Sequence, residues 1–166
     1  RQTLHITALI KLRLYKEADS QLLTLGNLDQ TKYGNAVPMA LRLIKAEMPH
    51  FMAGADQAEN SRKAQNNLYA LQSRVLGKNA PSGAQQTTKS LASLELDAAE
   101  AQRWLERISY SLMNIFLAQE KFGLALEICQ QMQKDFAATN GGAKHSPELC
   151  TLEVRIYLQV GNLDEA

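Results

Sequence analysis

The stretch Phe122-Gly123-Leu124-Ala125 decides the fold, because its pattern of a large apolar residue three positions before an alanine returns along the chain. The pattern also occurs at Tyr15-Lys16-Glu17-Ala18 and Leu163-Asp164-Glu165-Ala166, and more weakly at Ala55-Asp56-Gln57-Ala58. A small residue at a fixed place in a helix lets a neighbouring helix approach closely. The four phrases therefore predict a series of paired helices.

The alanines that end these phrases are unevenly spaced. The separations are 40, 67 and 41 residues along the chain, against about 34 for a tetratricopeptide repeat. Each excess coincides with a connector rich in Gly, Asn or Ser, so helices of regular length are joined by variable segments. This predicts an all-α, tetratricopeptide-like helical-hairpin solenoid of about three and a half hairpins. Generic hairpins with chance Glu-Ala pairs are the alternative.

The boundaries follow from breaks in the helical pattern. We expect one solenoid fragment over residues 1–166, with hairpins at about 1–26, 37–77 and 94–137, an incomplete hairpin at 146–166, and a flexible insertion at about 78–93. In the first helix, Leu4, Ala8 and Leu12 recur at helical spacing. The same spacing predicts buried stripes in three later helices: Ala58, Ala64, Leu68, Leu71 and Val75; Trp104, Ile108, Leu112, Ile115 and Phe116; and Phe122, Ala125, Cys129, Met132 and Phe136. Because the pattern starts at once and stops in a new helix, we expect a piece of a longer polypeptide.

Several residues are predicted to start or end helices. Gly26 and Gly161 are natural left-handed caps. Pro49 should bend the third helix or mark its last turns. Ser146 followed by a proline is a strong N-terminal signal, with the hydroxyl as cap.

Charge and hydropathy exclude two classes of partner. Lys and Arg number 18 against 17 Asp and Glu, with no basic cluster. Nucleic-acid binding needs clustered positive charge, so no nucleic-acid partner is expected. The apolar runs are too short to cross a bilayer, so no direct membrane insertion is expected.

The sequence predicts no catalytic residue, metal site or cofactor. His5, His50 and His145 each lack a second ligand at helical spacing. Cys129 and Cys150 lie in apolar helical patterns and are predicted to be small buried residues, with a disulfide as the alternative. An α-helical enzyme would need paired acids, or a His and a Cys brought together by the fold.

Two helices supply the candidate partner-binding residues. Hairpin arrays bind ligands on the surface formed by the first helix of each hairpin. Counting from Ala125 places Tyr110 and Asn114 on that surface, together with Arg155 and Gln159 of a later helix. Phe51, after the proline, is a candidate apolar anchor for a neighbouring subunit.

Short collinear phrases carry a resemblance to a known family. They are Gly26-Asn27-Leu28-Asp29-Gln30, Val37-Pro38, Arg42 with Ala46-Glu47, Arg107 with Tyr110-Ser111 and Asn114, and Leu158-Gln159-Val160-Gly161. In their order and spacing the chain resembles the tetratricopeptide-repeat region of the subunit 12 family of the trafficking protein particle (TRAPP) complex. The resemblance covers nearly the whole chain, except for the segment at residues 77–93.

This resemblance implies a cytoplasmic subunit of a TRAPP III-type hetero-oligomer, peripheral to endoplasmic reticulum–Golgi membranes. Such a complex supports Rab GTPase nucleotide exchange and membrane tethering in endoplasmic reticulum-to-Golgi traffic and autophagy. Exchange belongs to the small core subunits, so the resemblance carries over no catalytic residue and implies a scaffold bound to other TRAPP subunits. The alternative function is a tetratricopeptide adaptor that binds short peptide motifs in another pathway.

Overall fold

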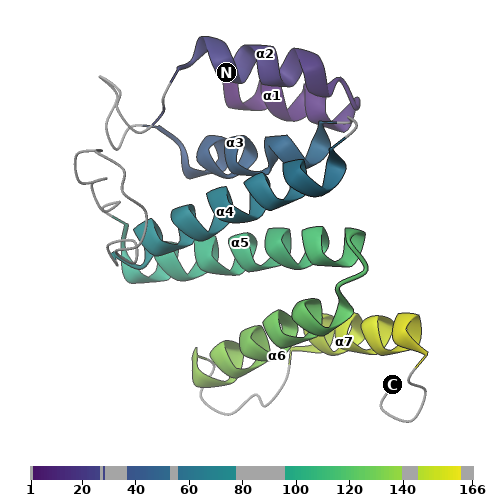
Figure 1. The fold of residues 1–166 in the computed structure, drawn as a ribbon. Helices are drawn as coiled ribbons and strands as arrows, with labels where there is room; N and C mark the ends of the chain where they lie inside the picture. The colour runs from purple at the N-terminus through teal and green to yellow at the C-terminus, as the bar shows by residue number, and fades with distance from the viewer. Residues whose placement is uncertain are drawn as a thin grey trace, which may run out of the picture. The chain divides into compact units, whose positions relative to one another are not determined.

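The computed structural model describes residues 2–26, 28, 37–52, 56–77, 96–139 and 146–161. These residues form seven helices and no strand, so the predicted all-α helical-hairpin class is confirmed (Figure 1). The helices are α1 (Gln2–Lys11), α2 (Tyr15–Thr24), α3 (Met39–Phe51), α4 (Gln57–Val75), α5 (Ala98–Ala118), α6 (Phe122–Thr139) and α7 (Pro147–Val160). The predicted insertion at 78–93 and the expected eighth helix lie outside the described residues.

The chain divides into two compact units, Arg1–Ile108 and Ser109–Ala166, with the boundary inside α5. In the first unit, α1 packs on α2, both contact α3, and α3 packs along α4 (Figure 1). In the second unit, α6 packs on α7. Helices adjacent in sequence thus pack together within each unit, as in a solenoid. The assignment of residues 1–166 to one domain stays a prediction.

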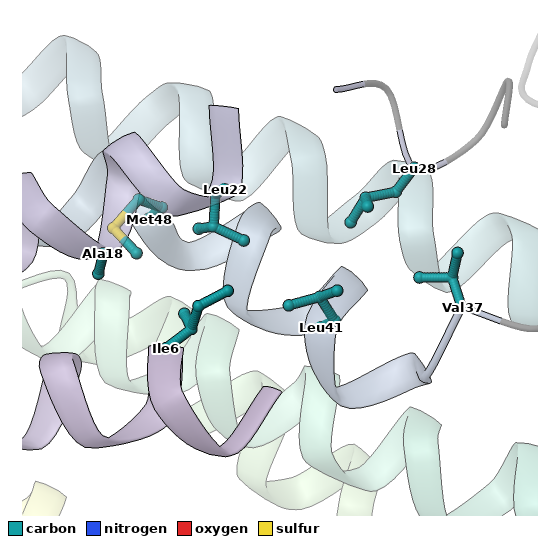
Figure 2. Packing of buried hydrophobic residues seen from close by; sticks show 7 residues of the cluster. All are labelled: Ile6, Ala18, Leu22, Leu28, Val37, Leu41 and Met48. Atoms are coloured by element: carbon teal, nitrogen blue, oxygen red, sulfur yellow. The ribbon is translucent and has the colours of Figure 1, made fainter. Parts of the chain in front are cut away.

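A cluster of apolar side chains holds α1, α2 and α3 together. Its buried members are Ile6, Ala18, Leu22, Leu28, Val37, Leu41 and Met48 (Figure 2). The stripe expected on α1 was wrong, because Leu4 and Leu12 are 76% and 68% exposed. Ile6, with Leu9 and Ile10, lies on the side that α2 and α3 cover. At 3.6 residues per turn, Leu4 and Leu12 point elsewhere.

Two of the predicted caps are confirmed, and a third works differently. Gly26 and Gly161 have φ of 67° and 81°, the left-handed conformation that suits glycine. Ser146 precedes α7 as predicted, but its hydroxyl donates to Glu148 Oε2 at 2.8 Å and caps no backbone N–H. A charged carboxylate is a strong acceptor for a hydroxyl, and this bond ties Ser146 to the first turn of α7.

Proline and aspartate mark two further helix ends. Pro49 lies in the last turn of α3, which ends at Phe51, as predicted. Helix α5 begins at Ala98, later than the expected residue 94, because Asp97 Oδ1 accepts the Glu100 N–H at 2.6 Å. This bond caps the helix and places a carboxylate at the positive end of its dipole.

The remaining helices bury most of the predicted stripes. The buried residues are Ala64, Leu68, Leu71 and Val75 in α4, Ile108, Leu112, Ile115 and Phe116 in α5, and Ala125, Cys129 and Met132 in α6. Met113 of α5, fully buried, was missed. Trp104, expected in the buried stripe, is half-buried, with the Arg107 guanidinium 4.8 Å from its ring centroid.

Candidate interaction surface

The turns that join α1 to α2 and α5 to α6 have the same structure. Each has three residues, with the middle one in the left-handed conformation: Arg13 at φ 59° and Glu120 at φ 58°. The N–H of Leu14 donates to Leu9 O, and that of Lys121 to Phe116 O, both at 2.9 Å. Neither central residue is a glycine, so the sequence did not reveal the turn conformation.

The alanine that follows each left-handed residue by five positions is fully buried. Ala18 and Ala125 are both 0% exposed. Helix α7 ends in the same way, since Gly161 is left-handed and its N–H donates to Leu158 O at 3.2 Å. The phrase ending in Ala166 follows Gly161 at the same distance, although it lies outside the described residues. A large apolar residue three positions before an alanine therefore indicates a hairpin turn of this structure.

The α3–α4 connection is built differently, and the weak phrase there was misread. Ala58 is exposed, whereas Ser61 and Ala64 are 1% and 0% exposed and supply the small buried positions of α4. Because Pro49 ends α3, Met52 leaves the helix in an extended conformation at ψ 106°. The connector to α4 covers residues 52–56, five residues against three in the other two hairpins.

The four polar candidates on α5 and α7 all reach solvent. Tyr110 is 37% exposed, and Asn114, Arg155 and Gln159 are also exposed. Tyr110 and Asn114 are four residues apart, as are Arg155 and Gln159, so each pair forms a stripe on its helix. All four lie in the second unit. Their role as partner contacts stays a prediction.

Phe51, the apolar candidate, is tied to the first unit. Its ring stacks on Tyr15, with centroids 5.4 Å apart and planes 11° apart, and His50 lies 5.7 Å from it. The side chain is half-buried as a result. Only one part of the ring is therefore available to a partner.

The α3–α4 joint contains a histidine and serine pair. His50 Nδ1 lies 3.0 Å from Ser61 Oγ, and burial lowers the pKa of His50. Ser61 is 1% exposed, so its hydroxyl is closed to substrates. The amides of Gln57 and Asn60 donate to the carbonyls of His50 and Met52 at 3.0 and 3.2 Å. This arrangement joins two helices and provides no accessible nucleophile.

The α6–α7 joint contains both cysteines, as free thiols. The Gln133 amide donates to Cys150 Sγ at 3.4 Å and Glu153 Oε2 at 3.3 Å. The Cys129 thiol lies 3.5 Å from Leu149 O. Burial, with Glu153 and Cys150 nearby, raises the pKa of Cys129 to about 11. The thiol stays protonated near neutral pH and is a poor nucleophile.

A metal centre and a membrane-spanning helix are both absent from the described part of the chain. Within it, no group of three His, Cys, Asp or Glu residues is placed to hold a metal ion. None of its helices is both long and apolar enough to cross a bilayer.

These features define an all-α protein built from helical hairpins, two of which share one turn. The chain is similar to trafficking protein particle complex subunit 12 of Homo sapiens and of Mus musculus. In each case the two sequences are 24% identical over 180 aligned residues, and the alignment covers 97% of this chain. The chain spans only 23% and 21% of those relatives, respectively. No protein-family model and no solved structure matches it.

Proposed function

We propose that the chain is a non-catalytic interaction module of a TRAPP III-type complex, folded as tetratricopeptide-like hairpins. The observation that carries the proposal is the similarity to subunit 12, because it extends over 97% of the chain. The repeated hairpin turn supports a repeat architecture, whose usual role is to present an extended binding surface. The closed Ser61 hydroxyl and the protonated Cys129 thiol support a role without catalysis.

In this role the module binds other TRAPP subunits and is a peripheral, cytoplasmic part of a hetero-oligomer. The complex would support Rab GTPase nucleotide exchange and membrane tethering in endoplasmic reticulum-to-Golgi traffic and autophagy. The module contributes binding surface, and a few anchors supply most of the affinity. Tyr110 and Arg155 are suited to be anchors, because Tyr and Arg are enriched among residues that dominate binding energy.

Affinity purification of the tagged whole protein tests this function. We expect TRAPP subunits in stoichiometric amounts, and fewer of them from a Tyr110→Ala, Asn114→Ala variant. Lys134→Ala, at an exposed position of α6, is the matched control and should leave recovery unchanged. Absence of every TRAPP subunit under mild conditions would rule the proposal out.

The second candidate is an adaptor that binds short peptides. It is favoured by the exposed Arg155, whose guanidinium suits a carboxylate, on the same kind of stripe as Tyr110 and Asn114. Titration with fluorescent acidic peptides separates the two functions. Saturable binding lost in Arg155→Ala, together with no stable complex in cells, would favour the adaptor.

A further inference from the structure

The turn between α1 and α2 exposes apolar and basic side chains side by side. Residues 11–16, which we call the basic–apolar turn, have the sequence Lys-Leu-Arg-Leu-Tyr-Lys. Leu12 and Leu14 are 68% and 41% exposed. The three cations are exposed as well: Lys11, Arg13 and Lys16. Within the described part of the chain none of these cations forms an ion pair or a side-chain hydrogen bond.

The α5–α6 turn shows that the fold does not require these leucines. The two turns have the same backbone conformation and the same closing hydrogen bond. In the α5–α6 turn, however, Gln119 and Lys121 occupy the positions of Leu12 and Leu14. Leucine at these two positions therefore has no part in forming the turn.

Exposure is a property of the turn itself. In the α5–α6 turn, Glu120 and Lys121 are also exposed, although one helix of the chain precedes them and another follows. Arg13 and Leu14 occupy the same two positions in the basic–apolar turn. A turn of this kind thus reaches solvent in the middle of the sequence as well as near its start.

The basic–apolar turn is held in one conformation. Arg13 is left-handed, and the N–H of Leu14 donates to Leu9 O at 2.9 Å. The ring of Tyr15 stacks on Phe51 of α3, with centroids 5.4 Å apart. Because the backbone is already fixed, binding through this turn would cost little conformational entropy.

We propose that the basic–apolar turn binds the surface of an anionic lipid membrane. Leu12 and Leu14 would enter the layer between the headgroups and the acyl chains, where apolar side chains leave water. The cations would stay among the anionic headgroups, to which basic side chains are attracted. Only the side chains of one turn enter the lipid, so no segment crosses the bilayer. The inference goes beyond the proposed function, because it does not depend on membership of a TRAPP complex.

A protein partner fits this surface less well. A stable protein interface involves roughly 20–30 residues on each side, whereas the basic–apolar turn has six. A lipid surface needs no complementary shape, and reversible binding to it combines apolar burial with attraction to anionic lipids. The basic–apolar turn supplies both within a short segment.

Flotation with lipid vesicles tests the surface. The full chain is mixed with vesicles of phosphatidylcholine that contain about 30 mol% phosphatidylserine, and separately with vesicles of phosphatidylcholine alone. We expect binding to the anionic vesicles and little to the neutral ones. Binding should weaken as the salt concentration rises, because salt screens the attraction between the cations and the headgroups.

The double variant Leu12→Gln, Leu14→Gln tests the apolar contribution. Its affinity for the anionic vesicles should fall about tenfold or more, because the apolar burial is lost while the cations remain. Leu23→Gln is the matched control and should bind normally. Leu23 is 69% exposed, like Leu12, but lies at the other end of α2. All three leucines are exposed, so the variants should fold like the parent chain, and circular dichroism checks that they do.

Substituting the cations tests the electrostatic contribution. Lys11→Gln and Lys16→Gln should each lower the affinity about fivefold, because each removes one charge near the headgroups. Lys121→Gln and Lys134→Gln, at exposed positions of the α5–α6 turn and α6, are the controls and should leave the affinity unchanged.

A tryptophan at position 12 measures insertion. Trp104 is the single tryptophan of the chain, so Leu12→Trp is made together with Trp104→Phe. Lipids brominated on their acyl chains should quench the fluorescence of this variant. They should not quench Leu23→Trp made in the same way, because position 23 lies away from the turn.

Three outcomes would overturn the proposal: equal or absent binding to both kinds of vesicle, unchanged affinity in Leu12→Gln, Leu14→Gln, or no quenching at position 12. The last two would reduce the contact to adsorption of charge or assign the turn to an acidic protein surface. The proposed function is tested separately by co-purification. If TRAPP subunits co-purify and the vesicles do not bind, only the membrane surface is wrong. If the vesicles bind as expected and no TRAPP subunit co-purifies, the proposed function fails and the membrane surface stands.

Discussion

Two neighbouring hairpins of the first unit are closed by different means. Between α1 and α2 the backbone makes the turn, through the left-handed Arg13 and the Leu14 N–H bond to Leu9 O. Between α3 and α4 a proline ends the first helix, and side-chain amides of α4 bond to the carbonyls of His50 and Met52. A backbone turn places the next helix in a fixed register, whereas a joint made by side chains can form at other spacings.

This difference explains where the repeated phrase is meaningful. A fixed register after the turn puts Ala18 and Ala125 at the point of closest packing, so the phrase reappears with the turn. The α3–α4 hairpin lacks that register, and its small buried positions fall at Ser61 and Ala64. The phrase at Ala58 is therefore a coincidence of composition.

The largest expected effect comes from filling the small positions. Ala18→Leu and Ala64→Leu should each lower the free energy of unfolding by about 2–3 kcal/mol, because extra methylenes in a close-packed core force strain. Ala58→Leu should change it by no more than about 0.5 kcal/mol, since that position faces solvent. Urea unfolding followed by circular dichroism measures all three. Equal losses at Ala58 and Ala64 would mean that the weak phrase is a true repeat position.

The side-chain joint should show an intermediate effect. Ser61→Ala removes the hydroxyl partner of His50 at a position that is 1% exposed. It should cost about 1–2 kcal/mol, because a half-buried ring nitrogen loses its hydrogen bond. Thr24→Val, which removes an exposed hydroxyl bonded to Gln21 O, is the control and should cost less than about 0.5 kcal/mol.

A double-mutant cycle isolates the contact between the two side chains. Ser61→Ala and His50→Ala together should be less damaging than the sum of the single substitutions, by about 0.5–1.5 kcal/mol. Strict additivity would show that the 3.0 Å contact contributes nothing and that α3 and α4 are joined by apolar packing alone.

The sequence predicted the elements whose cause is local. Glycine and proline determine helix ends through their own backbone geometry, so Gly26, Gly161 and Pro49 were predicted correctly. The apolar stripe of α5 was predicted because its residues share one face at helical spacing. The all-α class followed from these local signals together.

The misplaced features depend on contacts between helices. Leu4 and Leu12 have the same local pattern as a buried stripe, and only the positions of α2 and α3 make Ile6 the buried residue. Arg13 and Glu120 adopt the left-handed conformation because packing of the following helix requires it, which no residue type signalled. The candidate contacts Tyr110 and Arg155 can be recognised in the sequence as exposed polar residues. What they would contact depends on the surface of another molecule, which this sequence does not contain.

The shared turn should respond identically at its two sites. Arg13→Gly and Glu120→Gly should each raise the free energy of unfolding by about 0.5–1 kcal/mol, because glycine adopts positive φ without steric cost. Gly161→Ala should lower it by about 1 kcal/mol for the same reason. Lys134→Gly, at an exposed position inside α6, is the control and should lower it by about 0.8 kcal/mol. Opposite signs at Arg13 and Glu120 would show that the two turns differ.

The smallest effect concerns pH and separates the two kinds of joint. Burial lowers the pKa of His50 from its ordinary value of 6.5, so the unfolded chain takes up the proton more readily than the folded one. The stability associated with neutral His50 is present above pH 6.5 and is lost as the pH falls below that value toward the folded pKa. Urea midpoints measured from pH 7.5 to 5 should therefore decrease, and His50→Gln should reduce that decrease. His5→Gln, at an exposed site on the α1–α2 hairpin, should leave the decrease in place. If the decrease persists unchanged in His50→Gln, the pH dependence arises from carboxylates elsewhere. The stability of the α3–α4 joint would then depend on pH no more than that of the backbone turn.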